Sequence, residues 1–165
     1  MYRVGDRVVY SSLGVMEIVD ITDQTVGDVT RKYYVLKEFA SYSSSLTYVP
    51  LDNEELVSQM KPLLTKDEIF DTVRAAKECP PIEWVEDNRA RSEMYKKIVA
   101  SGDRVRMLAM ISSINETGKR REEEGKKNYI ADETSMKRAE KIIYSEFALV
   151  LGIPESEIPA FIEKI

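Results

Sequence analysis

The hydrophobic period of the chain changes near residue 64, and this change constrains the fold more than any other feature. Before it, apolar residues come in short runs and alternations bounded by Gly, Pro and Ser, which is typical of strands. After it, they recur every three or four positions, which is typical of amphipathic helices. Thr65 followed by Glu68 has the pattern of a capping box, so a helix is expected to begin there. The sequence predicts an α+β protein with a β domain at 1–64 and a helical domain at 65–165.

Four or five short strands are expected in the first part. The clearest ones cover residues 4–10, 15–21, 33–36 and 46–49. Alternation in the second of them places Ile21 on the same face as Val15, opposite to Ile18. A tight turn is expected at Val26-Gly27-Asp28, because glycine accepts a positive φ. Strands so few and so short favour a small, strongly curved, barrel-like sheet.

About five helices are expected in the second part. They cover residues 65 to about 78, 86–100, 103–127, 132–151 and a short segment from Pro154 onward. Cys79-Pro80-Pro81 ends the first helix, since proline restricts the residue before it and lacks an N–H donor. Asp103 is expected to cap the start of the third helix, and Gly152 the end of the fourth.

Composition excludes most catalytic and metal chemistry. The chain has 165 residues, no histidine and one cysteine, Cys79. It therefore lacks the commonest general base and metal ligand, and one thiol makes neither an intrachain disulfide nor a cysteine-rich zinc site. Cys79 has no histidine to activate it, and the acidic runs 54–55 and 122–124 have no environment that would separate their pKa values. We expect no enzyme, no metal and no cofactor.

The chain is also expected to be a cytoplasmic protein without membrane contact. Its longest apolar runs fall far short of the roughly 20 residues of a membrane helix. The first residues, Met1 to Asp6, have no apolar signal-peptide core.

The net charge of −5, from 24 basic and 29 acidic residues, argues by itself against a nucleic-acid partner. The charge is uneven, however. Residues 84–141 hold 14 basic and 11 acidic side chains, and the rest of the chain holds 10 and 18. Composition alone leaves two interpretations open: a solvated helix surface with ion pairs, or a modest phosphate-binding patch whose affinity falls with salt.

Trp84, the only tryptophan, follows the proline pair and precedes the second helix. A single tryptophan in a small domain usually belongs to the core. An apolar side chain beside a basic helix can instead be exposed and wedge into a distorted DNA minor groove. The pattern favours the core, and the position at a loop–helix junction weakens that preference.

Taken together, the motifs identify a resemblance to the CarD family of bacterial transcription regulators (the CarD/CdnL group) over nearly the whole length. The motifs that carry it, in order, are residues 4–10 with Gly14, 33–36, 46–50, Trp84, 100–103, Ala139 and 146–148. Each is weak alone, and the ordered set is specific. The first of them is shared with the RNA-polymerase-interacting domain of transcription-repair coupling factors.

The resemblance implies a Tudor-like N-terminal domain that binds the RNA polymerase β subunit by extending its sheet edge. It implies that the helical domain contacts promoter DNA at the upstream edge of the transcription bubble, with Trp84 in the minor groove favouring the opened promoter. The expected DNA-binding residues are Trp84, Arg89, Arg91, Lys126 and Lys127. The expected polymerase-binding residues are Leu46, Thr47 and Tyr48, and some relatives have arginine where this chain has Tyr48.

A second hypothesis is a protein-only adaptor, in which the β module and the helical module each bind a protein partner. It predicts an exposed apolar groove on the helices and no effect of DNA on binding. Under either hypothesis a monomer is the simplest expectation.

Overall fold

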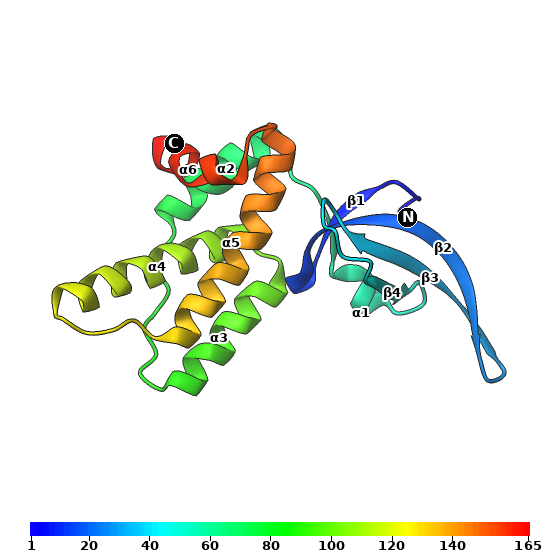
Figure 1. Cartoon of the computed structure of the whole chain (residues 1–165), viewed down its shortest axis with the longest axis horizontal. Helices are drawn as coiled ribbons and strands as arrows, with labels where there is room; N and C mark the ends of the chain where they lie inside the picture. The colour runs from blue at the N-terminus through cyan, green and yellow to red at the C-terminus, as the bar shows by residue number, and fades with distance from the viewer. The chain divides into compact units, whose positions relative to one another are not determined.

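The strands of the first part form one antiparallel sheet with the order β4-β3-β2-β1-β5 (Figure 1). The computed structural model describes all of residues 1–165, and its strands are β1 (Arg7–Tyr10), β2 (Gly14–Val26), β3 (Val29–Glu38), β4 (Leu46–Pro50) and β5 (Met60–Pro62). A 3₁₀ turn (Ser11–Leu13) joins β1 to β2, and the short helix α1 (Glu54–Ser58) follows β4. The chain divides into two units, Met1–Leu63 and Leu64–Ile165, of which only the first contains strands. The predicted α+β class is confirmed.

The core of the first unit lies on one face of this sheet. Its buried side chains are Val8, Tyr10, Met16, Ile18, Tyr34, Leu36, Val49 and Met60. Helix α1 packs Leu56 and Val57 against this cluster. Because β4 and β5 form the two edges of the sheet, the expected curved sheet is present but does not close into a barrel.

A β-bulge in β2 changes which residues face this core. The register with β3 shifts between Ile18 and Asp20, so Val19 is the extra residue and is 37% exposed. One inserted residue reverses the alternation beyond it. Ile21 consequently packs against the same core as Ile18, and the expectation that it shares a face with Val15 is wrong.

The turn expected at Val26-Gly27-Asp28 is confirmed. Val26 pairs with Val29 across a two-residue loop, and Gly27 has φ 63°. A positive φ at this position suits the tight turns that join twisted antiparallel strands. The β2–β3 hairpin is long and strongly bent (Figure 1).

Five helices build the second unit. They are α2 (Lys66–Glu78), α3 (Asn88–Ser101), α4 (Arg104–Glu123), α5 (Ile130–Leu151) and α6 (Ile158–Lys164), the last preceded by a 3₁₀ turn, Glu155–Glu157. Their buried apolar side chains come mostly from α4 and α5, including Met107, Met110, Ile142 and Phe147. None of these helices combines the length and the apolar composition needed to cross a membrane.

Helix α4 ends earlier than its charged sequence suggests. The predicted helix runs to residue 127, whereas α4 stops at Glu123 and Gly125 has φ 72°. A left-handed residue terminates a helix, and glycine adopts it without steric cost. Lys126 and Lys127 therefore lie in the loop between α4 and α5.

The predicted capping residues hold the helix ends. The Thr65 Oγ1 accepts from the Glu68 N–H at 3.3 Å, and the Glu68 carboxylate accepts from the Thr65 N–H at 2.7 Å. The hydrogen bond from the Thr65 N–H to the carboxylate, followed by the effect of the Thr65 side chain, holds the pKa of Glu68 below its usual value. Asp103 caps α4 by accepting from the Arg106 N–H at 3.0 Å. The capping box and this cap are both confirmed.

Two buried ion pairs attach other helices to α5. Arg91 of α3 pairs with Asp132 (N–O 3.0 Å), and Arg104 of α4 pairs with Glu146 (N–O 2.9 Å). The two acids are 14 positions apart on α5, which corresponds to about 21 Å along the helix axis. The pairs therefore form two separate attachments, one near each end of α5.

Candidate nucleic-acid interface

Trp84 lies in the loop between α2 and α3, and its side chain is half-buried. The backbone of this loop is attached on both sides of the tryptophan. Before it, the Ile82 N–H donates to the Ser113 Oγ of α4 at 3.0 Å. After it, the Val85 carbonyl accepts from Nη1 of Arg91 at 2.7 Å. Trp84 is thus fixed at the surface of the helical unit and is not among its fully buried core residues.

Arg91, one of the expected DNA-binding residues, is only 1% exposed, so its guanidinium is not presented at the surface. Its Nε donates to both carboxylate oxygens of Asp132, at 3.1 and 3.0 Å. Its Nη1 donates to the carbonyls of Val85 and Glu86, and its Nη2 donates to Asn88 Oδ1 at 2.7 Å. All three guanidinium nitrogens are occupied, so a phosphate would have to displace these partners.

Arg91 also lies over two aromatic rings. Its Cζ is 4.1 Å from the ring centroid of Trp84 and 4.6 Å from that of Tyr129. The two ring centroids are 5.8 Å apart, with 37° between the ring planes. Arg121 lies over Tyr129 as well, with its Cζ 4.1 Å from the centroid. Cations over ring faces are attracted by the ring quadrupole, so these four residues form one cluster, called here the Trp84 cluster.

The other predicted DNA-binding side chains are exposed, two or three positions in sequence from Arg91 or Tyr129. Arg89 lies in the first turn of α3, and Lys126 and Lys127 lie in the α4–α5 loop. Arg121 Nε donates to the Lys127 carbonyl at 2.9 Å, which holds that loop beside Tyr129. Lys126 donates to Glu124 at 2.8 Å, and this hydrogen bond lowers the pKa of the Glu124 carboxyl.

The charge near Trp84 is mixed rather than uniformly basic. Glu83 and Glu86 are exposed on either side of the tryptophan in sequence. Exposed carboxylates next to exposed lysines reduce the attraction for phosphate and leave it sensitive to salt. Any binding of free DNA at this surface is therefore expected to be weak.

Three residues of the site were not predicted from the sequence: Tyr129, Arg121 and Asp132. Tyr129 follows the Lys126-Lys127 pair, and an aromatic residue beside a basic pair is a weak signal for nucleic-acid contact. Asp132 gives no local signal, because its partner Arg91 is 41 positions away.

Strand β4 presents the three predicted polymerase-binding residues at one edge of the sheet. Leu46 is 45% exposed, Tyr48 is 43% exposed, and Thr47 is half-buried. The Leu51 N–H donates to the Lys32 carbonyl at 2.9 Å, so antiparallel alternation turns the backbone N–H and C=O of Tyr48 away from β3. An edge with outward backbone groups can accept a further strand.

A comparison with known protein families identifies the domain formed by the first unit, Met1–Leu63. Residues 2–61 match the family described as the CarD-like/TRCF RID domain. The first unit is a CarD-like/TRCF RID domain. The predicted resemblance is thereby confirmed for residues 2–61, and the chain is a transcription-related protein that interacts with RNA polymerase. No curated protein matches the sequence.

The RID domain is a protein-interaction domain, and β4 is one of the two edges of its sheet. The match ends at residue 61, before the helical unit begins at Leu64. The Trp84 cluster therefore lies outside the matched residues.

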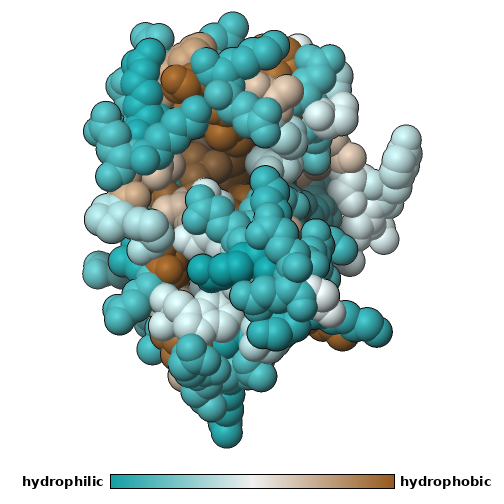
Figure 2. Space-filling view, turned by 90° about the vertical axis from the view of Figure 1, so that its left-hand side faces the viewer, coloured by the Kyte–Doolittle hydropathy of each residue, from teal (hydrophilic) through white to brown (hydrophobic).

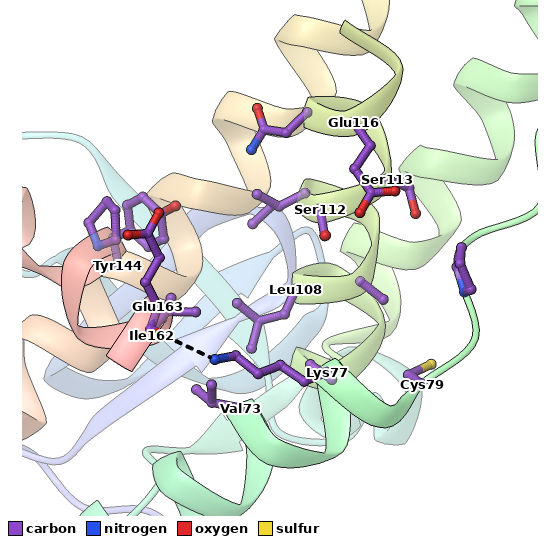
Figure 3. A pocket seen from close by; sticks show the side chains of 16 residues that line it. Val73, Lys77, Cys79, Leu108, Ser112, Ser113, Glu116, Tyr144, Ile162 and Glu163 are labelled. Atoms are coloured by element: carbon purple, nitrogen blue, oxygen red, sulfur yellow. Dashed lines mark hydrogen bonds between the residues drawn. The ribbon is translucent and has the colours of Figure 1, made fainter. Parts of the chain in front are cut away.

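The helical unit also has a hollow of about 600 Å³ with a mixed apolar and polar lining. Figure 2 shows brown, apolar side chains at the bottom of a hollow on this face of the protein. Val73, Leu108 and Ile162 line the hollow from α2, α4 and α6, and Tyr144 lines it from α5 (Figure 3). Lys77 donates to the Glu163 carbonyl at 3.4 Å at its border.

The structure contains no group of side chains arranged to bind a metal ion. No three Cys, Asp or Glu side chains gather closely enough to hold a metal ion.

Proposed function

We propose that this protein is a non-enzymatic transcription regulator that binds RNA polymerase and promoter DNA together and stabilises the open complex. The RID domain binds the polymerase β subunit through β4. The helical unit contacts DNA at the upstream edge of the bubble, where Trp84 enters the minor groove. Arg89, Lys126 and Lys127 contact phosphates beside it, and Arg91 supports the tryptophan from within.

The polymerase contact in this proposal uses the outward edge of β4. Backbone N–H and C=O groups there pair with an extended segment of the β subunit, and the side chains of Leu46 and Tyr48 supply apolar contact. Tyr48 stacks edge-to-face on Tyr33, with 6.3 Å between centroids, so its ring is held at the edge. This support suits an aromatic contact at the position where some CarD-family members have arginine.

The DNA contact uses Trp84 as a wedge. Unstacking one base step costs on the order of a few kcal/mol, and an inserted aromatic ring recovers part of that cost by contact. A protein that contacts the opened junction better than closed duplex shifts the equilibrium toward the open form by its difference in affinity. Weak affinity for free DNA is compatible with this action, because the polymerase contact supplies a high effective concentration.

One observation carries the proposal: a half-buried tryptophan, attached on both sides, occurs beside exposed basic residues in a chain that also has a RID domain. The test measures the lifetime of open complexes formed by purified RNA polymerase on a promoter. Wild-type protein should lengthen the lifetime, and Trp84→Ala should lose that effect by about tenfold or more, equivalent to about 1.4 kcal/mol. Trp84→Phe should keep part of it, since a smaller ring still fills the step.

Two controls accompany this test. Trp84→Ala must keep its helical circular dichroism and its affinity for polymerase. Arg74→Ala, which removes an exposed arginine paired with Asp71 on α2, should behave as wild type. An unfolded Trp84→Ala variant would instead assign the tryptophan to the core.

The apolar part of this hollow favours the second candidate, the protein-only adaptor, because that hypothesis predicts an exposed apolar groove on the helices. Ala76 lines the hollow and is half-buried, so Ala76→Arg would fill the hollow without touching Trp84. If the adaptor hypothesis holds, Ala76→Arg abolishes the effect on the open complex and Trp84→Ala leaves it unchanged. The DNA-wedge proposal predicts the reverse result.

A further inference from the structure

We infer that Arg91 is a positioning residue for Trp84, and that its ion pair with Asp132 fixes the orientation of the tryptophan ring. The positioning itself is a property of the free protein. The consequence for transcription rests on the proposed function of Trp84.

The geometry of Arg91 places one side chain at the junction of three elements. It originates from α3, pairs with Asp132 of α5, and donates to the carbonyls of the two residues that follow Trp84. The Asn88 side chain accepts from Nη2 and completes the set. Arg91 thus ties the backbone beside Trp84 to α5 and its own guanidinium face to the tryptophan ring.

Burial makes this arrangement rigid. Arg91 is 1% exposed and Asp132 is 4% exposed, so neither charge can turn toward water without breaking the pair. Buried charges persist only when they are paired and hydrogen-bonded, which restricts the guanidinium to one orientation. The rings of Trp84 and Tyr129 then pack against a fixed plane.

Lysine does not reproduce these contacts. A guanidinium offers five N–H donors in one plane and stacks on ring faces, whereas an ammonium is a compact point charge with three donors. Arg91→Lys keeps a positive charge beside Asp132. A lysine ammonium cannot, however, donate hydrogen bonds to the Asp132 carboxylate, the two backbone carbonyls and the Asn88 side chain at the same time. The loop would keep its attachment at Ile82 and lose the one after Trp84.

Loss of this support should weaken the binding of DNA through Trp84. A side chain that is ordered before binding loses less conformational entropy on binding. In a variant without the support, the tryptophan must be ordered by the DNA contact itself. The expected effect on the open complex is a partial loss, smaller than that of Trp84→Ala.

The single tryptophan provides a direct readout on the full-length protein. Fluorescence on excitation at the tryptophan band reports Trp84 alone. Arg91→Lys should shift the emission to longer wavelength and raise the acrylamide quenching constant, because the ring becomes mobile and more hydrated. The same variant should shorten the open-complex lifetime by about fivefold.

Arg104→Lys is the matched control. It alters the other buried ion pair to α5, about 21 Å along the helix axis from Asp132. Its loss of thermal stability should resemble that of Arg91→Lys, because both variants weaken a buried arginine–carboxylate pair. Its Trp84 emission and quenching should stay as in the wild type. A purely structural role for Arg91 would give the two variants the same fluorescence.

Asp132→Asn is the second variant, for the case that Arg91→Lys does not fold. It keeps the shape of the side chain and releases Arg91, and it should raise the quenching constant as well. Wild-type emission and quenching in a folded Arg91→Lys or Asp132→Asn protein would overturn the inference. If the fluorescence changes as expected but Trp84→Ala has no effect on the open complex, the positioning role stands and the proposed function fails.

Discussion

Two arginines in the first turn of α3 have opposite environments, although both are basic residues two positions apart in the sequence. Arg89 is exposed in the first turn, and Arg91, two positions later, is 1% exposed and paired with Asp132. Exposed charges contribute little to stability, whereas removing one partner of a buried pair leaves an uncompensated charge. The two positions therefore form a natural comparison.

Arg91→Met should lower the free energy of unfolding of the helical unit by about 3–5 kcal/mol. Arg89→Met should change it by less than about 0.5 kcal/mol, because no buried contact is lost. Urea unfolding followed by circular dichroism measures both. Equal losses in the two variants would contradict the assignment of Arg91 to the interior.

Two tyrosines of the helical unit should make its stability depend on alkaline pH. Burial raises the pKa of Tyr95 and that of Tyr144 to about 12, and the nearby carboxylates of Asp132 and Glu140 add to the effect. The unfolded tyrosines titrate near 10, so the unfolded state loses protons first. Stability should be fully present below pH 10 and should fall as the pH rises toward 12.

Urea unfolding at a series of pH values between 9 and 12 tests this expectation. Tyr95→Phe should reduce the decline, since phenylalanine does not titrate. A decline of the same steepness in Tyr95→Phe and wild type would show that this tyrosine does not contribute.

At the scale of elements, β4 is an edge strand: one side pairs with β3, and the backbone groups of the other side have no partner strand. Its register with β3 is fixed from Leu46 to Pro50, and Val49 is completely buried in the core. Only the other backbone edge, at Leu46 and Tyr48, is available for pairing. Proline is tolerated on an edge strand where its missing N–H would face outward.

Tyr48→Pro should therefore keep the fold of the RID domain and weaken polymerase binding on the order of tenfold, through loss of one backbone donor and the ring. Tyr48→Val, which keeps the donor, should lose less. Surface plasmon resonance with purified polymerase measures both affinities. Wild-type affinity of a folded Tyr48→Pro protein would exclude pairing through this edge.

Helix α5 has a comparable double function in the helical unit. Asp132 near its start holds Arg91 at the Trp84 cluster, and Glu146 near its end accepts from the Leu64 N–H at 3.0 Å and pairs with Arg104. Both acids are completely or almost completely buried. Because each buried acid pairs with an arginine of another helix, α5 is attached to α3 near its start and to α4 near its end.

For the whole molecule, the net charge of −5 conceals an uneven distribution of charge along the chain. The surplus of basic residues is confined to 84–141, which contains the Trp84 cluster and the exposed side chains near it. Two units with separate partners need little affinity each, because binding of one raises the effective concentration of the other. We therefore expect free DNA to bind weakly and the polymerase–promoter complex to bind much more tightly.

The salt dependence of DNA binding tests how many phosphates are contacted. With Arg89, Lys126 and Lys127 in contact, the logarithm of the binding constant should fall with the logarithm of salt concentration with a slope of about −3. Replacing Arg89 and Lys127 together by glutamine should reduce the slope by about 2. Fluorescence anisotropy with labelled duplex DNA measures it, and Arg74→Gln is the control. An unchanged slope in the double variant would exclude these two side chains from the phosphate contact.

Several details could not be predicted from the sequence. The alternation in β2 fails at Val19 because a bulge is a property of the pairing with β3 and not of β2 alone. The charged run after residue 119 reads as helix throughout, yet Gly125 ends α4 in the left-handed region. The burial of Arg91 could not be predicted, because nothing near it in sequence indicates its partner Asp132.

Helix α1 and strand β5 were not predicted. The change from strands to helices near residue 64, several helix caps and the resemblance of the N-terminal unit to the CarD family could be predicted from the sequence alone. These depend on hydrophobic period, on turn chemistry and on motifs, which are local in the chain. Which charges are buried and which side chains meet became evident only from the folded chain. Trp84, Arg91, Tyr129 and Arg121 come from separate segments, and their contacts exist because α5 and the two loops fold against one another. Burial and long-range pairing depend on the whole fold, and a local pattern does not encode them.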